Sequence, residues 1–505
     1  MATVVEDDPQ VLSRRADAHE YPIFVIHLAI AHLVKCCVSF QGIAGSFGLW
    51  SQLLDIKAPA ANTIREWALR VGLYILTHTV SRRDDWIWVI DLSVELGTAK
   101  CLVILGISQA AWNERLKSGN GELTHQDMSV LALDVLAQCN GETIKARLEA
   151  LSKRVGSPVQ IVSDHGSDIK KGITEYLKGQ KTPTIHTYDI THASACCLKQ
   201  QLKNDESFQS FLSQMNQCRQ QIQQTPLAFL MPPPQRTKAR YFNLDKTLTW
   251  AQRTLEYYHQ GDFSTLGTQY CWDEQAKEAM APIAQAHLLA PLETIQGVVY
   301  ETNTTFEHAL SSILSAETME HNGAEIVQSA DLTRRYVESK LGWLLPFESM
   351  LTPYIQRFEI VHLVNASLKH HGLNHHSHHT LAHQLHQLEL SDEAKAFGQL
   401  LLEQVSQQAQ SCEEGQTSLA TSDVIESLFG KYKLFGQRSP IKEIGPLILL
   451  IPLCTEKLTA ALVKTALETI RSIDVKEWLS NTLGTTMFGQ RKAALSPTRL
   501  DMKPA

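Results

Sequence analysis

The stretch QIVSDHGSDIKKGITEYL, residues 160–177, decides the fold of this chain. Apolar residues run up to Asp164, a glycine follows, and a segment with helical spacing then begins, which is typical of a buried strand that leads into a helix. A carboxylate at such a strand end has two interpretations. It is either a turn residue, because aspartate side chains bond their own backbone in turns, or a metal ligand held on a rigid element.

The residues around this stretch predict an α/β core. Three β-rich runs come first, and helical and β-rich runs then alternate up to residue 192. This order predicts a mixed five-stranded sheet with a parallel part and with helices on its faces. In chain order the runs are DWIWVIDLSVELGTAKCLVILGI (85–107, two strands), MSVLALDVLA (128–137), GETIKARLEALSKRVG (141–156), SPVQIVSD (157–164), SDIKKGITEYLKG (167–179) and TIHTYDITH (184–192).

Helical patterns flank this core and suggest four regions. We expect an N-terminal helix-turn-helix-like DNA-binding domain at 1–80 and the first part of the core at 85–204. An all-α insertion is expected at 205–415, and the core is expected to be completed by helices at 416–505.

The DNA-binding interpretation of residues 1–80 depends on their third helical segment. Thr63 and Glu66 have the spacing of a capping box at its start. Two short helices joined by a turn, the second carrying Arg65 and Arg70, are compatible with a helix-turn-helix. The alternative is a helical hairpin that only packs.

Composition limits the function classes. The 505 residues carry a net charge of −7, so any DNA binding must come from local basic segments rather than from the whole surface. The acidic N-terminus argues against a signal peptide. The apolar run at 444–454 is too short for a membrane span and contains two prolines, so we expect a buried core segment there. The cysteines form no CxxC pair, and we expect a cytoplasmic protein with reduced thiols.

Two aspartates stand at the ends of predicted strands. Asp91 ends the first strand and Asp164 ends the fourth, and in a sheet of this order those strands are commonly neighbours. Two adjacent carboxylates repel each other, and a divalent cation offsets that repulsion. Mg²⁺ prefers oxygen ligands and retains several waters, so two or three carboxylates suffice to hold it. Taken singly, each aspartate is as well explained by a turn.

Glu426, in the segment SDVIESLFGKYK, is the expected third acidic ligand. Thr421 or Ser422 can cap this helix, and Glu426 lies about one turn in, on a face shared with Phe429 and Lys433. A helix with a buried apolar stripe and one carboxylate at its edge is able to deliver a ligand to the end of a sheet. The alternative is a glutamate on the surface.

In the order and spacing of these acidic residues and the segments around them, the chain resembles a DDE transposase of the bacterial insertion-sequence type, a family with a ribonuclease-H-like fold. The resemblance rests on Asp91, SDHGSD (163–168), YDITH (188–192) and ESLFGKYK (426–433), and it covers most of the chain. YDITH has the form of the [C/D]xxH motif of hAT-type transposases, which also place a large helical insertion before the final glutamate.

The resemblance implies a role for each matching residue. Asp91, Asp164 and Glu426 would bind two Mg²⁺ ions, for which Mn²⁺ substitutes. His192, which is paired with Asp189 in the [C/D]xxH motif, would lie near the scissile phosphate. The alternative for His192 is a histidine that only packs in the core.

The implied reaction is DNA transposition by two in-line phosphoryl transfers, which one site can perform: cutting of the transposon ends and joining of their 3′-hydroxyls to target DNA. The implied partners are double-stranded DNA and further copies of the chain on that DNA, with the cytoplasmic protein associated with the nucleoid when bound. One departure is that Leu419 and Ser422 stand where many relatives have a tyrosine and an arginine. The alternatives are a relative that binds DNA as a regulator without cutting it, and a nuclease without strand transfer.

Two basic segments, 231–256 and 431–442, are the expected contacts to DNA phosphates. Lys433 corresponds to the basic residue that often follows the glutamate in the family. A solvated helix face is the alternative for either segment. With the two arginines of the N-terminal domain, the expected DNA-binding residues are Arg65, Arg70, Arg236, Lys238, Arg240, Lys431, Lys433 and Arg438.

The histidine-rich run KHHGLNHHSHHTLAHQLHQ (369–387) invites a zinc interpretation. His379 and His383 are four residues apart, as zinc ligands on a helix are. No acidic or cysteine partner lies in the run, so we expect a polar helix or loop instead. Walker and GxSxG motifs are absent from the sequence, which argues against ATP dependence and against a serine hydrolase.

Overall fold

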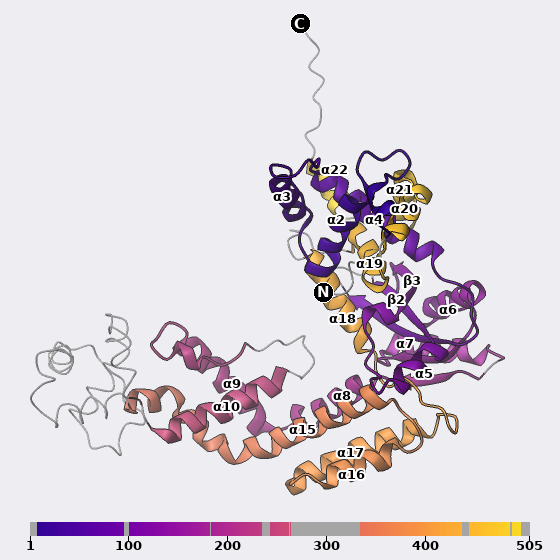
Figure 1. The fold of residues 1–505 in the computed structure, drawn as a ribbon. Helices are drawn as coiled ribbons and strands as arrows, with labels where there is room; N and C mark the ends of the chain where they lie inside the picture. The colour runs from indigo at the N-terminus through magenta and orange to yellow at the C-terminus, as the bar shows by residue number, and fades with distance from the viewer. Residues whose placement is uncertain are drawn as a thin grey trace, which may run out of the picture. The chain divides into compact units, whose positions relative to one another are not determined.

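The computed structural model divides into two units, each of which is described by itself (Figure 1). The sheet unit comprises Met1–Ala193, Asn365–Leu381 and Gln404–Ala505, and the helical unit comprises Ser194–Val364 and Ala382–Glu403. The described residues are 8–94, 100–181, 183–234, 243–261, 263, 334–436, 444–484 and 487–495.

A five-stranded mixed sheet organises the sheet unit, as predicted. The strand order is β3-β2-β1-β4-β5. β1 and β2 are antiparallel, as are β2 and β3, whereas β4 is parallel to both β1 and β5. The first and fourth strands are therefore neighbours, which confirms the expectation from their order. The strands are β1 (Trp86–Val94), β2 (Lys100–Ser108), β3 (Ser129–Leu136), β4 (Pro158–Ser163) and β5 (Ile185–Tyr188).

Helices from both ends of the chain, together with the helices between the strands, complete the sheet unit. They are α1 (Pro9–Ser13), α2 (Ile23–Cys36), α3 (Phe40–Trp50), α4 (Ala61–His78), α5 (Gln109–Lys117), η1 (His125–Asp127), α6 (Gly141–Val155), α7 (Ser167–Lys178), α18 (Asp423–Gly436), η6 (Pro446–Leu449), α19 (Leu450–Thr455), α20 (Ala460–Thr469), α21 (Ser472–Leu483) and α22 (Met487–Leu495).

Side chains that alternate along each strand give the sheet two buried faces. On one face, Trp88 of β1 and Ile161 of β4 pack with the apolar sides of α6 and α7. On the other, Val89 of β1 and Val162 of β4 belong to a cluster with α4, α18 and α19. We call this second surface the α18 face. Because both faces are covered, the strands read as almost continuous apolar runs.

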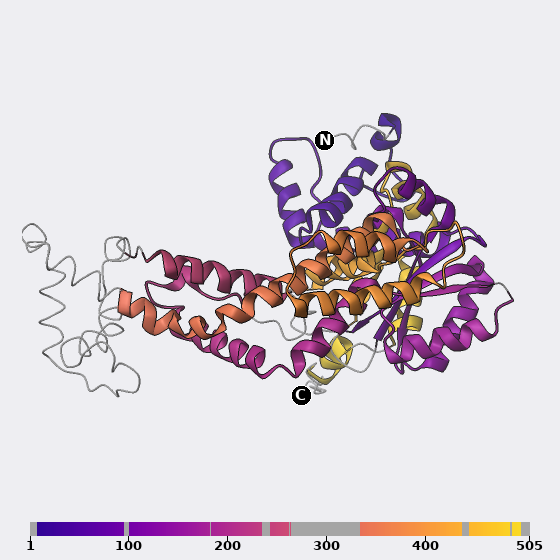
Figure 2. The same cartoon turned by 90° about the horizontal axis from the view of Figure 1, so that it is seen from below.

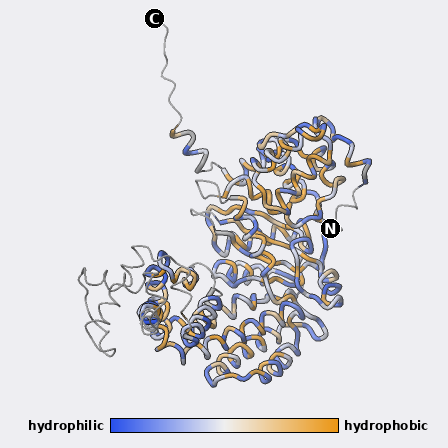
Figure 3. Tube along the Cα trace, turned by 60° about the vertical axis from the view of Figure 1, so that its left-hand side comes forward, coloured by the Kyte–Doolittle hydropathy of each residue, from blue (hydrophilic) through white to orange (hydrophobic). Residues whose placement is uncertain are grey.

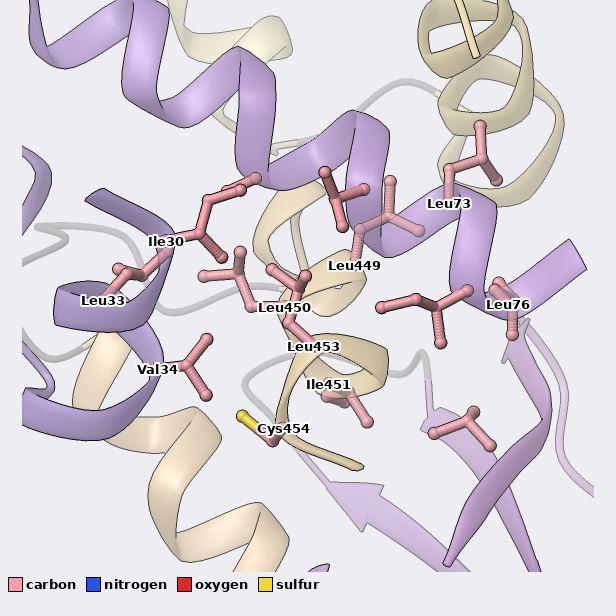
Figure 4. Close-up of a cluster of buried hydrophobic side chains, with 14 of the residues drawn as sticks. Ile30, Leu33, Val34, Leu73, Leu76, Leu449, Leu450, Ile451, Leu453 and Cys454 are labelled. Carbon is pink, nitrogen blue, oxygen red and sulfur yellow. The ribbon is translucent and has the colours of Figure 1, made fainter. Parts of the chain in front are cut away.

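The N-terminal and C-terminal helices share one hydrophobic core (Figure 4). α4 contacts α2 and α3 as well as α19, α20 and α21. In that core Leu33 and Leu73, from the N-terminal helices, share one cluster with Leu449 and Leu450, from the C-terminal helices. The described part of residues 1–80 therefore shares its core with the C-terminal helices and does not form a compact unit by itself. The prediction that residues 444–454 form a buried core segment is confirmed.

Helix α4 begins earlier than its sequence suggests. Its N-cap is Ala60, which makes no side-chain capping bond, so the capping box predicted from Thr63 and Glu66 is wrong. The chain leaves Pro59 and enters the helix at once, so both residues already lie within its first two turns. Further along, Gly72 permits close packing, because a Cβ there would overlap the carbonyl oxygen of Leu449.

The described residues of the helical unit contain helices and no strand, as expected for an all-α insertion. Its long helices run side by side (Figure 2), and hydrophobic and hydrophilic residues alternate along them (Figure 3). Residues 264–333 of the predicted insertion lie outside the described residues. The helices of this region, four of which extend into the sheet unit's ranges, are α8 (Ile190–Lys203), α9 (Glu206–Ile222), η2 (Ala228–Leu230), α10 (Asn243–Gln260), η5 (Gly342–Phe347), α15 (Glu348–His371), α16 (Ser377–His386) and α17 (Asp392–Ala409).

None of the described helices combines the length and the apolar character that a membrane span requires.

Candidate functional site

The register of β1 and β4 sets Asp91 beside Asp164. The last paired residues of these parallel strands are Ile90 and Ser163, and the next residue on each chain is one of the two aspartates. Asp164 therefore follows the last residue of β4. Asp91 lies within β1, where it pairs with Val103 of β2 and the strand continues to Val94, so the prediction that Asp91 ends the first strand is wrong. The juxtaposition follows from the backbone pairing and does not depend on the conformation of either side chain.

Both aspartates belong to the α18 face of the sheet. Val89, two residues before Asp91, and Val162, two residues before Asp164, are buried in the cluster that includes α18. Since side chains two apart along a strand point to the same face, the carboxylates fall on the side that α18 covers. Asp91 and Asp164 are themselves partly exposed.

Local hydrogen bonds orient the two carboxylates. The Oδ1 atom of Asp91 accepts the Leu92 N–H at 2.7 Å, and Oδ1 of Asp164 accepts the Gly166 N–H at 2.9 Å. His165, between Asp164 and Gly166, has a φ of 56°, which is a left-handed backbone conformation uncommon for residues other than glycine. Such strain persists where the surrounding structure enforces it, and here it re-aims the chain immediately after the strand.

Glu426 reaches the same face on α18. Val424, Ile425, Leu428 and Phe429 of this helix are buried in the α18-face cluster, and the helix packs against β1. Glu426 lies at the edge of that apolar stripe and is partly exposed.

The three carboxylates share a face of the sheet without forming a closed ligand set. Across the described ranges, no group of three His, Cys, Asp or Glu side chains is arranged to hold a metal ion. The structure thus bears out that β1 and β4 are neighbours and that α18 packs on β1, but it does not assemble Asp91, Asp164 and Glu426 into the ligand triad that the resemblance implies.

A buried glutamine ties the segment before α18 to the sheet. Gln160, in β4, accepts the Leu419 N–H at 3.0 Å and donates from Nε2 to the Leu419 carbonyl at 2.8 Å. The same amide donates to Thr187 of β5 at 2.7 Å. Alongside, the Ile190 N–H donates to the Ala420 carbonyl at 3.0 Å. The chain that enters α18 is thereby held at the parallel edge of the sheet.

Asp189 makes the second tie. It is fully buried, and its Oδ2 accepts the Ser422 hydroxyl at 2.6 Å while its Oδ1 accepts the Thr191 N–H at 2.9 Å. Its own N–H donates to the Ser163 carbonyl at 2.9 Å. The helix cap comes from Thr421, whose Oγ1 accepts the Asp423 N–H at 3.0 Å, and the Ser422 hydroxyl serves Asp189 instead.

Histidines surround the strand end that carries Asp164. The His165 ring stacks on Tyr188 with centroids 4.4 Å apart, and it lies 4.4 Å from the His186 ring. His192 lies 5.9 Å from Tyr188, between ring centroids. The Ser163 hydroxyl contacts His186 Nε2 at 2.9 Å. The motif histidine, His192, thus lies close to Tyr188 at the end of β5, together with two histidines that the motif does not include.

Burial keeps two of these rings neutral. Desolvation, and then the charge of nearby Lys170, lowers the pKa of His165 to about 4. Desolvation, followed by the proximity of His165 and Lys170, lowers the pKa of His186 to about 3. At neutral pH both imidazoles are therefore uncharged hydrogen-bonding groups.

The predicted DNA-binding residues have different surroundings. Arg70 is half-buried and donates from Nε to the Ile470 carbonyl at 2.6 Å, and its guanidinium also donates to the Leu467 carbonyl. It therefore caps the end of α20, which is a structural role and does not fit a phosphate contact. Arg65 is partly exposed on α4.

On α18, Lys433 is exposed, and Lys431 lines a pocket with His125. The remaining predicted contacts lie outside the described residues; these are Arg236, Lys238, Arg240 and Arg438.

The histidine-rich run forms the end of α15, a turn and α16. His379 and His383 are exposed on α16, and they belong to no group of three metal-ligand side chains in the described chain. The expectation of a polar helix and loop fits this placement.

Four residues of the site were not anticipated: Gln160, Ser422 as a partner of Asp189, His165 and His186. A glutamine inside the apolar run PVQIVS signals a buried polar partner, because an unpaired amide is costly in a core. The partner itself, at residue 419, lies too far along the chain for any local pattern to reveal it.

No protein-family model matches the sequence, and a search of the curated proteins finds no match either.

Proposed function

We propose that this chain is a metal-dependent DNA transposase with a ribonuclease-H-like core, which cuts transposon ends and joins their 3′-hydroxyls to target DNA. The observation that carries the proposal is the register of β1 and β4, which sets Asp91 beside Asp164 on the sheet face that α18 covers. A carboxylate pair on adjacent parallel strands, with a third carboxylate on the covering helix, is suited to divalent-cation chemistry.

The donor set fits magnesium. Asp91, Asp164 and Glu426 offer only oxygen ligands, and Mg²⁺ needs few of them because it retains water. When bound, two such ions supply a polarised phosphodiester and an activated hydroxyl at neutral pH. The chain's own residues do the positioning. The backbone of β1 and β4 fixes the spacing of the aspartates, and Asp189 and Gln160 fix the start of α18.

His192 would orient the scissile phosphate or its leaving oxygen. His165, which is neutral at pH 7, stacks on Tyr188, and the His192 ring lies tilted against the same tyrosine. Since both carboxylates lie where the pairing of β1 with β4 ends and are partly exposed, the phosphodiester would approach them there.

The test is a plasmid assay. Supercoiled plasmid carrying the DNA that flanks the reading frame is incubated with the full chain and Mg²⁺ or Mn²⁺, and nicked, cut and joined products are separated on gels. Asp164→Asn should abolish all three products while leaving DNA binding intact. Asp392→Asn, the same change at a fully exposed residue of α17, is the matched control and should be active. Equal activity of wild-type protein and Asp164→Asn would overturn the proposal.

A second candidate function is DNA binding without cutting, as a regulator. The lack of a closed three-ligand group in the described ranges favours it. In the same assay, this candidate predicts that wild-type protein retards the flanking DNA and never nicks it with either metal ion. A plasmid that is only hydrolysed, with no joined product, would indicate a nuclease of the same core.

A further inference from the structure

A pocket in the sheet unit, next to η1, is lined by lysines from distant parts of the chain. It has a volume of about 210 Å³ and is lined by α2, η1, α18 and the connection between α19 and α20. Lys35 comes from the last turn of α2, Lys431 from α18 and Lys457 from the α19–α20 connection. We call it the lysine pocket.

The charge of this pocket is predominantly positive. Its one acidic residue is Glu456, and burial raises the pKa of that carboxyl. His125 stands in the wall, where burial and the nearby charge of Lys431 lower its pKa. Three lysines and one carboxyl among the lining residues favour an anionic ligand over a cationic one.

The lysine pocket lies on a different side of α18 from the carboxylate that the proposed reaction uses. Ser427 and Lys431 are four residues apart and so share one side of the helix. That side faces His125, whose Nε2 is 3.1 Å from the Ser427 hydroxyl. Glu426 precedes Ser427 by one residue and therefore points about 100° away around the helix axis. An anion in the pocket is a binding contact rather than a reacting group.

We propose that the lysine pocket binds a phosphate group of a DNA backbone, alongside the candidate active site. Lys35 and Lys457 are exposed, so the pocket is open to an extended polyanion as well as to a small ion. On a chain with net charge −7, such a local cluster is the kind of feature that gives affinity for DNA. The proposal rests on the proposed function, since that function requires DNA to pass next to α18.

The experiment measures the salt dependence of DNA binding. The probe is a labelled duplex of the flanking DNA, and Ca²⁺ replaces Mg²⁺ to prevent cutting. Fluorescence anisotropy then gives the dissociation constant at several salt concentrations between about 0.1 and about 1 M. Each phosphate contact contributes about −0.9 to the slope of log K against log salt. Lys35→Gln and Lys431→Gln should each make the slope shallower by about this amount, which weakens binding about 8-fold near 0.1 M salt.

Two controls separate charge at this position from charge in general. Lys117→Gln removes an exposed lysine of α5 that pairs with Glu114, and it should leave the slope unchanged. Lys431→Arg keeps the positive charge and should retain the wild-type slope. Thermal melting of each variant shows that the fold is intact.

The outcomes are distinguishable. If wild-type protein does not bind the duplex at all, the proposed function fails as well. If it binds and the two glutamine variants keep its slope, only the assignment of the lysine pocket is overturned. A second arm uses inorganic phosphate against chloride at equal ionic strength. If phosphate raises the melting temperature of wild type but not of Lys431→Gln, while duplex binding is unchanged, the ligand is a free phosphate and the DNA assignment is wrong.

Discussion

The tie between Asp189 and Ser422 provides the sharpest test of how α18 is held. We predict that Ser422→Ala destabilises the sheet unit and loosens the start of α18. The substitution leaves Oδ2 of a fully buried carboxyl without the hydroxyl that donates to it at 2.6 Å. Hydrogen bonds to charged groups contribute about 1.5–3 kcal/mol, and an unsatisfied buried acceptor costs about 1–3 kcal/mol. The expected loss in the free energy of unfolding is therefore about 2–3 kcal/mol.

Two measurements check this prediction. Urea unfolding followed by circular dichroism gives the change in midpoint, and hydrogen exchange with mass spectrometry reports the α18 amides separately from those of α7. Exchange should accelerate in α18 and not in α7. Lys433→Ala is the control, because Lys433 is an exposed residue of the same helix, and a change within about 0.5 kcal/mol is expected there.

A double-mutant cycle completes the test. Asp189→Asn and Ser422→Ala remove opposite partners of one contact, so the double variant should lose clearly less stability than the sum of the single losses. Additive losses, or a Ser422→Ala protein that unfolds at the wild-type urea midpoint, would refute the inference that this hydrogen bond holds the helix.

Three further outcomes are expected. Gly72→Ala should destabilise by about 3 kcal/mol in urea unfolding, since its Cβ meets a backbone carbonyl, whereas Gly45→Ala, which meets nothing within 4 Å, should be neutral or slightly stabilising. Arg70→Gln should lower the thermal midpoint without changing the affinity for duplex DNA, and a loss of affinity in a folded variant would restore Arg70 as a DNA contact. Because the folded-state pKa of His186 is lowered to about 3, the unfolded chain takes up a proton as the pH falls below about 6.5 and the folded chain does not. Stability should then fall by up to about 1.4 kcal/mol per pH unit between pH 6 and 4, and a slope that is unchanged in His186→Gln would contradict this assignment.

The sequence predicts the sheet well because its signals are local. Apolar runs, their order and the alternating helices are enough to predict five strands and the adjacency of β1 and β4. That adjacency makes Asp91 and Asp164 candidates before any coordinates exist. The burial of residues 444–454 is also predicted from the sequence, because an apolar segment that is too short for a membrane span and contains two prolines is expected in a protein core.

What the sequence does not reveal depends on partners far apart in the chain. From the sequence, Arg70 looks like an exposed basic residue on a helix. Its guanidinium instead donates a hydrogen bond to the carbonyl of Ile470, which lies 400 positions further along the chain. The packing of the N-terminal helices is hidden from the sequence for the same reason, since the apolar faces of the first helices are covered by the last ones. Ser422 reads as a helix cap, and only the buried carboxyl of Asp189 explains why its hydroxyl turns elsewhere.

The shared core of α4 with α19, α20 and α21 has a consequence for biosynthesis. During translation, the first eighty residues emerge from the ribosome long before the segment that covers their apolar surface. Until residues 446–483 have been synthesised, this surface stays open to chaperones and to neighbouring nascent chains. Stop codons just before residue 446 should therefore yield insoluble product, even though they spare all five described strands.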